Sequence, residues 1–236
     1  FWTLELASDA GEVTVSVPQF FETAKMDEAW TGRWITCATD QARHPYFVKD
    51  IAAKEEVVRA RLYVCGLGLY EAYWDDKKIG NEYLTPYQNN YNRWVQYQTY
   101  DVTEQVKDGG KLRILLGNGW YGGRFGFSAH EEKGYFGNTH KLIAEVVVTY
   151  ADGTEEIIGT DETWQVERSR ITYSSIYDGE HMDQTLTDLA AEPVILCRTF
   201  EELAAAGKTD GQTVDDISQP EKDEQIPRGR LTARYS

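Results

Sequence analysis

The sequence predicts an all-β protein, folded as an antiparallel β-sandwich or jelly roll. Three observations favour this class. Short segments alternate apolar and polar residues with the period of a strand, turn residues recur every few positions, and helix-forming segments are almost absent. The 236 residues suffice for one large β domain or two small ones, with enough chain to bury a core.

The first 28 residues are predicted to form a strand, a turn and a second strand. Trp2, Leu4 and Leu6 alternate with polar positions, residues 9–11 (Asp-Ala-Gly) form the turn, and alternation resumes at residues 13–17. Because two strands do not form a stable sandwich alone, residues 1–28 are interpreted as the closing part of a separate small domain.

A jelly-roll sandwich is predicted over residues 29–195. Val58, Ala60, Leu62 and Val64 would share one face of a strand. Asp152-Gly153 is a strong hairpin signal between two strands. The other strands are expected at 69–74, 95–100, 111–116, 142–150, 155–160 and 163–166.

Two short helices are expected. Residues 101–104 (Asp-Val-Thr-Glu) resemble a capping box that begins one helical turn, which would end at Gly109-Gly110. Thr199 and Glu202 form a second capping box, and Gly207 would end that helix. Residues 196–236 are therefore assigned to a short helix followed by a polar linker.

Charge and cysteine content exclude several classes of function. The net charge of −15, from 39 acidic and 24 basic residues, repels nucleic acid and anionic membranes but leaves neutral ligands such as glycans open. The three cysteines are odd in number and lack CxxC spacing, which argues against a disulfide framework and a zinc site. The absence of a paired set favours a cytoplasmic over an exported protein.

The motifs for catalysis are weak. Residues 117–122 match GxGxxG, but no helical period follows, so a glycine-rich loop carrying Trp120 and Tyr121 is the better interpretation than a dinucleotide site. None of the four histidines lies in a nucleophile elbow or a metal-binding spacing. We therefore nominate no catalytic residue.

Asp75 and Asp76 are adjacent acids in a predicted turn. Aspartate favours turns because its side chain bonds the nearby backbone, so an ordinary turn is the simplest interpretation. Carboxylate oxygens so placed could also bind Ca²⁺ or the hydroxyls of a sugar.

A series of motifs in order resembles the N-terminal region of bacterial α-L-rhamnosidases, of the glycoside hydrolase class. The resemblance covers roughly residues 28 to 190, and the segment ending at residues 20–23 (Phe-Phe-Glu-Thr) resembles the close of a fibronectin-III-like domain. The motifs that carry it are WTGRWI at 30–35, HPYF at 44–47, ARLYV at 60–64, GLGLYE at 66–71, YQTYDVT at 97–103, GNGWYGGR at 117–124, GTDETW at 159–164, SIYDGE at 175–180 and Asp183.

The resemblance implies a galactose-binding-like jelly roll that precedes an (α/α) barrel carrying the catalytic carboxylates, so none is expected in this chain. Some members bind terminal L-rhamnose through Ca²⁺. The corresponding sugar-binding residues here would be Asp75, Asp76, Asn118, Trp120 and Arg124. The metal ligands would be Asp75, Asp76 and Asn118, although many relatives carry Asn-Gly in the Asp75 turn. Residues 177–180 are interpreted as structural.

Two functions stay open at this point. The sandwich is either a carbohydrate-binding module for L-rhamnose-containing glycans or a structural domain that packs on the catalytic barrel without binding sugar. An enzymatic activity of this chain alone lacks support, because no acid and base pair is visible.

Overall fold

The computed structural model describes residues 1–26, 28–38, 43–124, 136–187, 190–205, 226–227 and 229–233. Strands dominate the described chain, and its helices are only short turns, so the prediction of an all-β sandwich is confirmed. None of these helices is long and apolar enough to cross a membrane.

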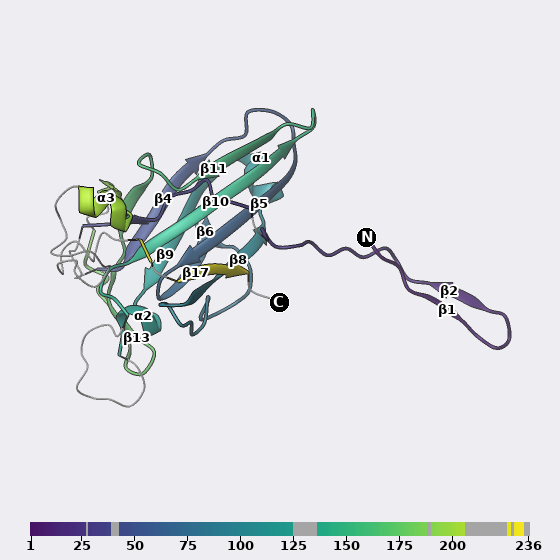
Figure 1. Cartoon of the computed structure of the whole chain (residues 1–236), viewed down its shortest axis with the longest axis horizontal. Helices are drawn as coiled ribbons and strands as arrows, with labels where there is room; N and C mark the ends of the chain where they lie inside the picture. Colours follow the sequence, from purple (N-terminus) through teal and green to yellow (C-terminus); the bar gives the residue numbers. More distant parts are fainter. Residues whose placement is uncertain are drawn as a thin grey trace.

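The first of two large sheets has seven strands. Its order is β16-β3-β10-β5-β8-β17, and β11 pairs with β10 (Figure 1). All pairs in this sheet are antiparallel except β17 with β8. The strands are β3 (Ile35–Thr36), β5 (Val57–Gly66), β8 (Trp94–Asp101), β10 (Lys141–Tyr150), β11 (Glu155–Gly159), β16 (Ile195–Leu196) and β17 (Arg230–Ala233).

The second large sheet has six strands in the order β15-β12-β4-β9-β6-β7, and all of its pairs are antiparallel. A separate hairpin of β13 and β14 extends from one end of the sandwich. The strands are β4 (Pro45–Ile51), β6 (Leu69–Trp74), β7 (Lys77–Lys78), β9 (Gly110–Gly117), β12 (Gln165–Arg168), β13 (Ile171–Ser175), β14 (Gly179–Met182) and β15 (Glu192–Pro193).

Apolar side chains from both large sheets form one core. Leu62 and Val146 of the first sheet are fully buried, as are Phe47 and Ile114 of the second. Trp164 closes this core and donates its indole N–H to the Gly159 carbonyl at 3.0 Å. Burial of these side chains supplies the main driving force for the fold.

Strand β5 departs from the predicted alternation at its first residues. Thr149 of β10 lies opposite Arg59, and the next residue, Tyr150, lies opposite Val57. Val58 is therefore the extra residue of a β-bulge, which turns its side chain outward to 59% exposure, while Val57 is buried. The expectation that Val58 shares the buried face of Ala60 is wrong for this reason.

The helices agree with the sequence in position and partly in capping. Helix α1 (Thr103–Asp108) ends at Gly109, which has φ of 70°. Its N-cap is Val102, without a side-chain capping bond, so the predicted box is wrong here. Asp101 instead accepts the Thr103 N–H at 3.0 Å.

Helix α3 (Phe200–Ala205) has the predicted capping box. Glu202 accepts the Thr199 N–H at 2.8 Å, and Thr199 Oγ1 accepts the Glu202 N–H at 3.2 Å. The predicted stop at Gly207 lies outside the described residues.

Two segments near the chain ends differ in how they relate to the sandwich. Strands β1 (Glu5–Ala7) and β2 (Val13–Val15) form the expected hairpin, which stands apart from the sandwich in Figure 1. Strand β17 lies within residues 196–236, which the sequence assigned to a helix and a linker, yet it extends the first sheet beside β8. Four residues with little alternation carry too weak a signal to predict such a strand.

A buried carboxylate holds the N-terminal segment (residues 22–26 and 28–34) on the first sheet. Glu145 of β10 is fully buried and pairs with the Lys25 ammonium at 2.7 Å. Its other oxygen accepts the backbone N–H groups of Thr31 and Gly32. The Lys25 ammonium also lies over the Trp30 ring at 5.4 Å, which is a cation–π distance.

Replacement of Glu145 by alanine should lower the free energy of unfolding by about 3–5 kcal/mol, because it leaves the Lys25 charge buried without its partner. Urea denaturation measures this. Glu104→Ala is the control, since Glu104 pairs with Lys107 on the surface, where solvent screens the pair and its loss should have little effect on stability. Equal effects of the two substitutions would contradict the assignment.

Candidate functional site

The Asp75-Asp76 turn is tied to the beginning of β9. The Asp75 N–H donates to the Lys111 carbonyl at 2.7 Å, and Asp75 Oδ1 accepts the Lys111 N–H at 2.9 Å. Asp76 is 95% exposed and pairs with Arg113 at 3.1 Å. The acidic oxygens thus already bond groups of this chain, although these groups belong to β9 and not to the backbone of the turn itself.

Asn118 lies at the other end of the same strand. In the pairing of β6 with β9, Trp74 is opposite Leu112, whereas Leu69 is opposite Gly117. Strand geometry therefore puts Asn118 about 24 Å from the Lys111 end.

The three residues predicted to ligate calcium do not form one site. Ca²⁺ gathers six to eight oxygens in a single shell of about 2.3–2.6 Å, and Asp75 and Asp76 are separated from Asn118 by the length of β9. Within the described part of the chain, no group of three or more His, Cys, Asp or Glu side chains could hold a metal ion. The calcium ligands implied by the resemblance thus lie apart in this structure.

The glycine-rich segment after β9 makes a tight turn against β6. Helix α2 (Gly119–Gly122) is a single four-residue turn, and no longer helix follows it in the described residues up to Arg124. Gly68 has φ of 102°, and a Cβ there would meet the Gly117 carbonyl oxygen at 2.2 Å. The glycines thus allow close backbone approach, and the long helix that a dinucleotide fingerprint needs is not formed at this turn.

Asn118 and Trp120 of this turn bond the β13–β14 hairpin. The Asn118 side-chain amide donates to the Ser174 carbonyl at 3.1 Å, and its backbone N–H donates to Ser174 Oγ at 3.3 Å. Trp120 Nε1 donates to the Tyr177 hydroxyl at 3.4 Å. The α2 turn and the hairpin therefore form one continuous surface.

Arg124 and Asp178 make a bidentate ion pair between the turn and the hairpin. Arg124 Nε and Nη2 donate to the two Asp178 oxygens at 2.9 and 2.8 Å. The guanidinium also lies over the Tyr177 ring, with the Arg124 Cζ 4.7 Å from the ring centroid. Such a planar fork combines charge, hydrogen bonding and stacking in one place.

Further donors converge on Asp178. Ser175 Oγ donates to it at 2.9 Å and the Tyr173 hydroxyl at 3.3 Å. The hydrogen bonds from Arg124, then those from Ser175 and Tyr173, hold the Asp178 pKa down at about 2. The side chain is thus a carboxylate acceptor throughout the physiological pH range.

The structure therefore brings together three of the five predicted sugar-binding residues: Asn118, Trp120 and Arg124. It also adds Tyr177 and Asp178, which belong to the segment that the sequence analysis interpreted as structural. The available sequence signal was the SIYDGE stretch, in which serine and aspartate three residues apart flank an aromatic residue, as in a side-chain-capped turn.

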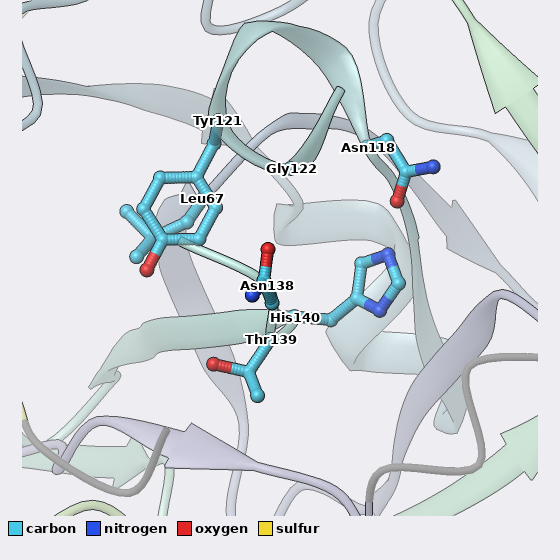
Figure 2. A pocket seen from close by; sticks show the side chains of 7 residues that line it. All are labelled: Leu67, Asn118, Tyr121, Gly122, Asn138, Thr139 and His140. Carbon is cyan, nitrogen blue, oxygen red and sulfur yellow. The ribbon is translucent and has the colours of Figure 1, made fainter. Parts of the chain in front are cut away.

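A small hollow lies under the α2 turn (Figure 2). It has no room for even one water molecule, so it is not a sugar pocket. Tyr121 and Leu67 form one side, and His140 and Asn118 lie on the other (Figure 2). A ligand would have to bind on the surface around Trp120 and Arg124 rather than in this hollow.

Comparison with known proteins identifies the family. Residues 55–194, more than half of the chain, match the model described as the α-L-rhamnosidase N-terminal domain. The chain belongs to this family. The resemblance stated from the sequence motifs is thereby confirmed.

Curated relatives of this family member include α-L-rhamnosidases much longer than this chain. One, from Streptomyces avermitilis, is 36% identical over 168 residues, which is 68% of this chain and 16% of the relative. Another, from Formosa agariphila, is 30% identical over 214 residues, or 78% of this chain and 22% of the relative. The chain thus spans about a fifth of the length of these relatives.

Solved structures of α-L-rhamnosidases share the fold. The enzyme from Dictyoglumus thermophilum gives a TM-score of 0.67 at 31% identity, over 84% of this chain and 25% of that protein. The Streptomyces avermitilis enzyme complexed with L-rhamnose gives 0.57 at 26% identity, over 81% of this chain and 22% of that protein.

The Asp178 carboxylate should titrate at pH of about 2, below the ordinary value of 3.8. Since its folded-state pKa is depressed, its contribution to hairpin stability is complete above pH of about 4 and declines as pH falls towards 2. Carboxyl-carbon NMR titration measures the pKa. In Arg124→Gln the value should move towards 3.8, and an unchanged value would contradict the role given to Arg124.

Proposed function

We propose that the sandwich is the accessory N-terminal module of an α-L-rhamnosidase and binds L-rhamnose-containing glycans. The single observation that carries this proposal is the constellation of Trp120, Arg124, Tyr177 and Asp178 on one end of the sandwich. Aromatic rings pack against the apolar faces of sugars, while guanidinium and carboxylate groups bond hydroxyls.

The charge of the molecule supports a neutral ligand. The chain carries a net charge of −15, which disfavours phosphorylated or otherwise anionic partners. At the proposed site, Arg124 and Asp178 compensate each other within 2.9 Å, so the surface is locally balanced. A neutral deoxyhexose fits that balance.

We infer that the proposed site binds sugar without calcium. Asp75 and Asp76, which would supply the carboxylate oxygens, lie beyond the far end of β9 from Asn118. Sugar binding at the α2 turn should therefore be the same with added Ca²⁺ and with a chelator.

The activity of the whole protein is a separate part of the proposal. The relatives that this chain matches are α-L-rhamnosidases several times its length. We propose that the complete protein hydrolyses α-L-rhamnosides in an (α/α) barrel supplied by sequence outside residues 1–236. Within the proposal, residues 1–28 contribute the last strands of a fibronectin-III-like domain that precedes the sandwich.

A structural role is the second candidate, and a specific observation favours it. The polar groups of the site largely satisfy each other, as Arg124 does with Asp178 and Asn118 with Ser174. Such a surface can serve as a rigid face for packing on the catalytic barrel. In that case, deleting the sandwich from the complete enzyme lowers stability and leaves the affinity for substrate unchanged.

Calorimetry with millimolar L-rhamnose tests the first candidate. We expect binding heat that is equal with Ca²⁺ and with EDTA. We expect Trp120→Ala to bind L-rhamnose about tenfold more weakly, since tryptophans that become buried carry much of the binding energy at interfaces. Tyr83→Ala is the matched control, because Tyr83 is a 71% exposed aromatic residue in another loop. Absence of heat in the wild-type protein would leave only the structural candidate.

A further inference from the structure

Two histidines meet between the sheets beside the proposed site. His44 directly precedes β4 of the second sheet, and His140 directly precedes β10 of the first. His44 Nδ1 and His140 Nε2 are 3.1 Å apart, and the rings are nearly perpendicular at 80°. One N–H···N hydrogen bond therefore links the two sheets at this end.

The histidine pair contacts both elements of the proposed site, the β13–β14 hairpin and the α2 turn. The His44 N–H donates to the Ile171 carbonyl at 2.9 Å, and the His44 carbonyl accepts the Ser169 N–H at 2.9 Å, which holds the beginning of β13. His140 lines the hollow under the α2 turn together with Asn118. Movement of the histidine pair would thus reach the hairpin and the turn together.

The hydrogen bond requires a neutral His44 ring. The His44 ring also bonds the Leu116 carbonyl, so its other nitrogen is the acceptor that faces His140. If His44 gains a proton, both facing nitrogens carry hydrogen, and the bond is replaced by repulsion. A proton on His140 instead places an added charge on a buried ring. Acid can therefore break the contact between the two rings.

The charged groups around the pair disfavour protonation. Arg168 acts on His140 and is itself held by the Ala38 carbonyl and Glu192, while Arg43 bonds the carbonyls of Arg168 and Ser169. The neighbouring Lys141 is buried.

Burial of the rings adds to this effect. It lowers the pKa of His44 to about 4, and burial together with His44 and Arg168 lowers the pKa of His140 to about 3.

We propose that His44 and His140 form an acid-sensitive latch that releases the β13–β14 hairpin and the α2 turn when either ring is protonated. In the closed state the histidines stay neutral, whereas in the opened state they titrate near 6.5. The opened state therefore binds more protons below pH 6.5. Its population should rise by up to about tenfold per pH unit per histidine down to about pH 4.

The consequence for ligands rests on the proposed function. If L-rhamnose binds between Trp120 and the hairpin, acid opening separates the residues that hold it. Affinity scales with the fraction of molecules in the closed state. It should therefore fall at the acidic pH where the opened state becomes the major one, by up to about tenfold per further pH unit for one titrating histidine, without a change in the charge of Asp178, whose pKa of about 2 lies below this range.

Amide hydrogen exchange at pH 7.5, 6.5, 5.5 and 4.5, corrected for intrinsic rates, tests the latch. Amides of the hairpin should show the acid-dependent rise in opening, while those of β5 and β10 should not. His140→Gln and, as a second variant in case the first fails to fold, His44→Gln should each remove one of the two titrating rings and lower the rise by up to about tenfold per pH unit. His181→Gln is the control, because His181 is an exposed histidine on the same hairpin and should leave the rise intact.

The outcomes separate the latch from the proposed function. Equal acid response of the hairpin and of β10, or an unchanged response in both glutamine variants, would overturn the latch. Calorimetry with L-rhamnose at pH 7.5 tests the sugar site independently. Sugar binding without acid-dependent opening of the hairpin would contradict the latch alone. Acid-dependent opening without sugar binding would contradict the sugar site alone.

Discussion

The antiparallel pairing of β9 with β6 and β4 determines which residues of this module can act together. Strand β9 is eight residues long and runs from the Asp75 turn at one end of the second sheet to the α2 turn at the other. Register is strongly specified because one face of β9 is buried, and a shift by one residue would expose Leu112, Ile114 and Leu116. The separation of the acidic turn from Asn118 is therefore a property of the core and not of the loops.

A second constraint fixes the N-terminal segment on the first sheet. Buried Glu145 draws in one ammonium and two backbone N–H groups, all from the N-terminal segment (residues 22–26 and 28–34). Glu22 extends this attachment by pairing with Arg59 and Arg61 of β5. The segment that leads from the β1–β2 hairpin is thus held on the first sheet, while the proposed site occupies the end formed by α2 and β13–β14.

Much of the fold was accessible from local sequence patterns. Alternation and the Asp152-Gly153 turn predicted the β10–β11 hairpin, because both signals act over a few residues. Val58 and β17 were not predictable, since a bulge and a short parallel edge strand depend on partners far along the chain. For the site, the glycine-rich turn was predicted, but the approach of Asp178 to Arg124 spans 54 residues and has no local signature. The same limit explains why Asp75, Asp76 and Asn118 were grouped although β9 separates them.

The most direct test of this account is mapping of L-rhamnose on the isotopically labelled chain by NMR chemical-shift perturbation. The account predicts that shifts concentrate at Asn118, Trp120 and Arg124 and at Tyr177 and Asp178 of the hairpin, while the Asp75-Asp76 turn stays unperturbed. Shifts concentrated at Asp75 and Asp76, with the α2 turn and the hairpin unaffected, would contradict it.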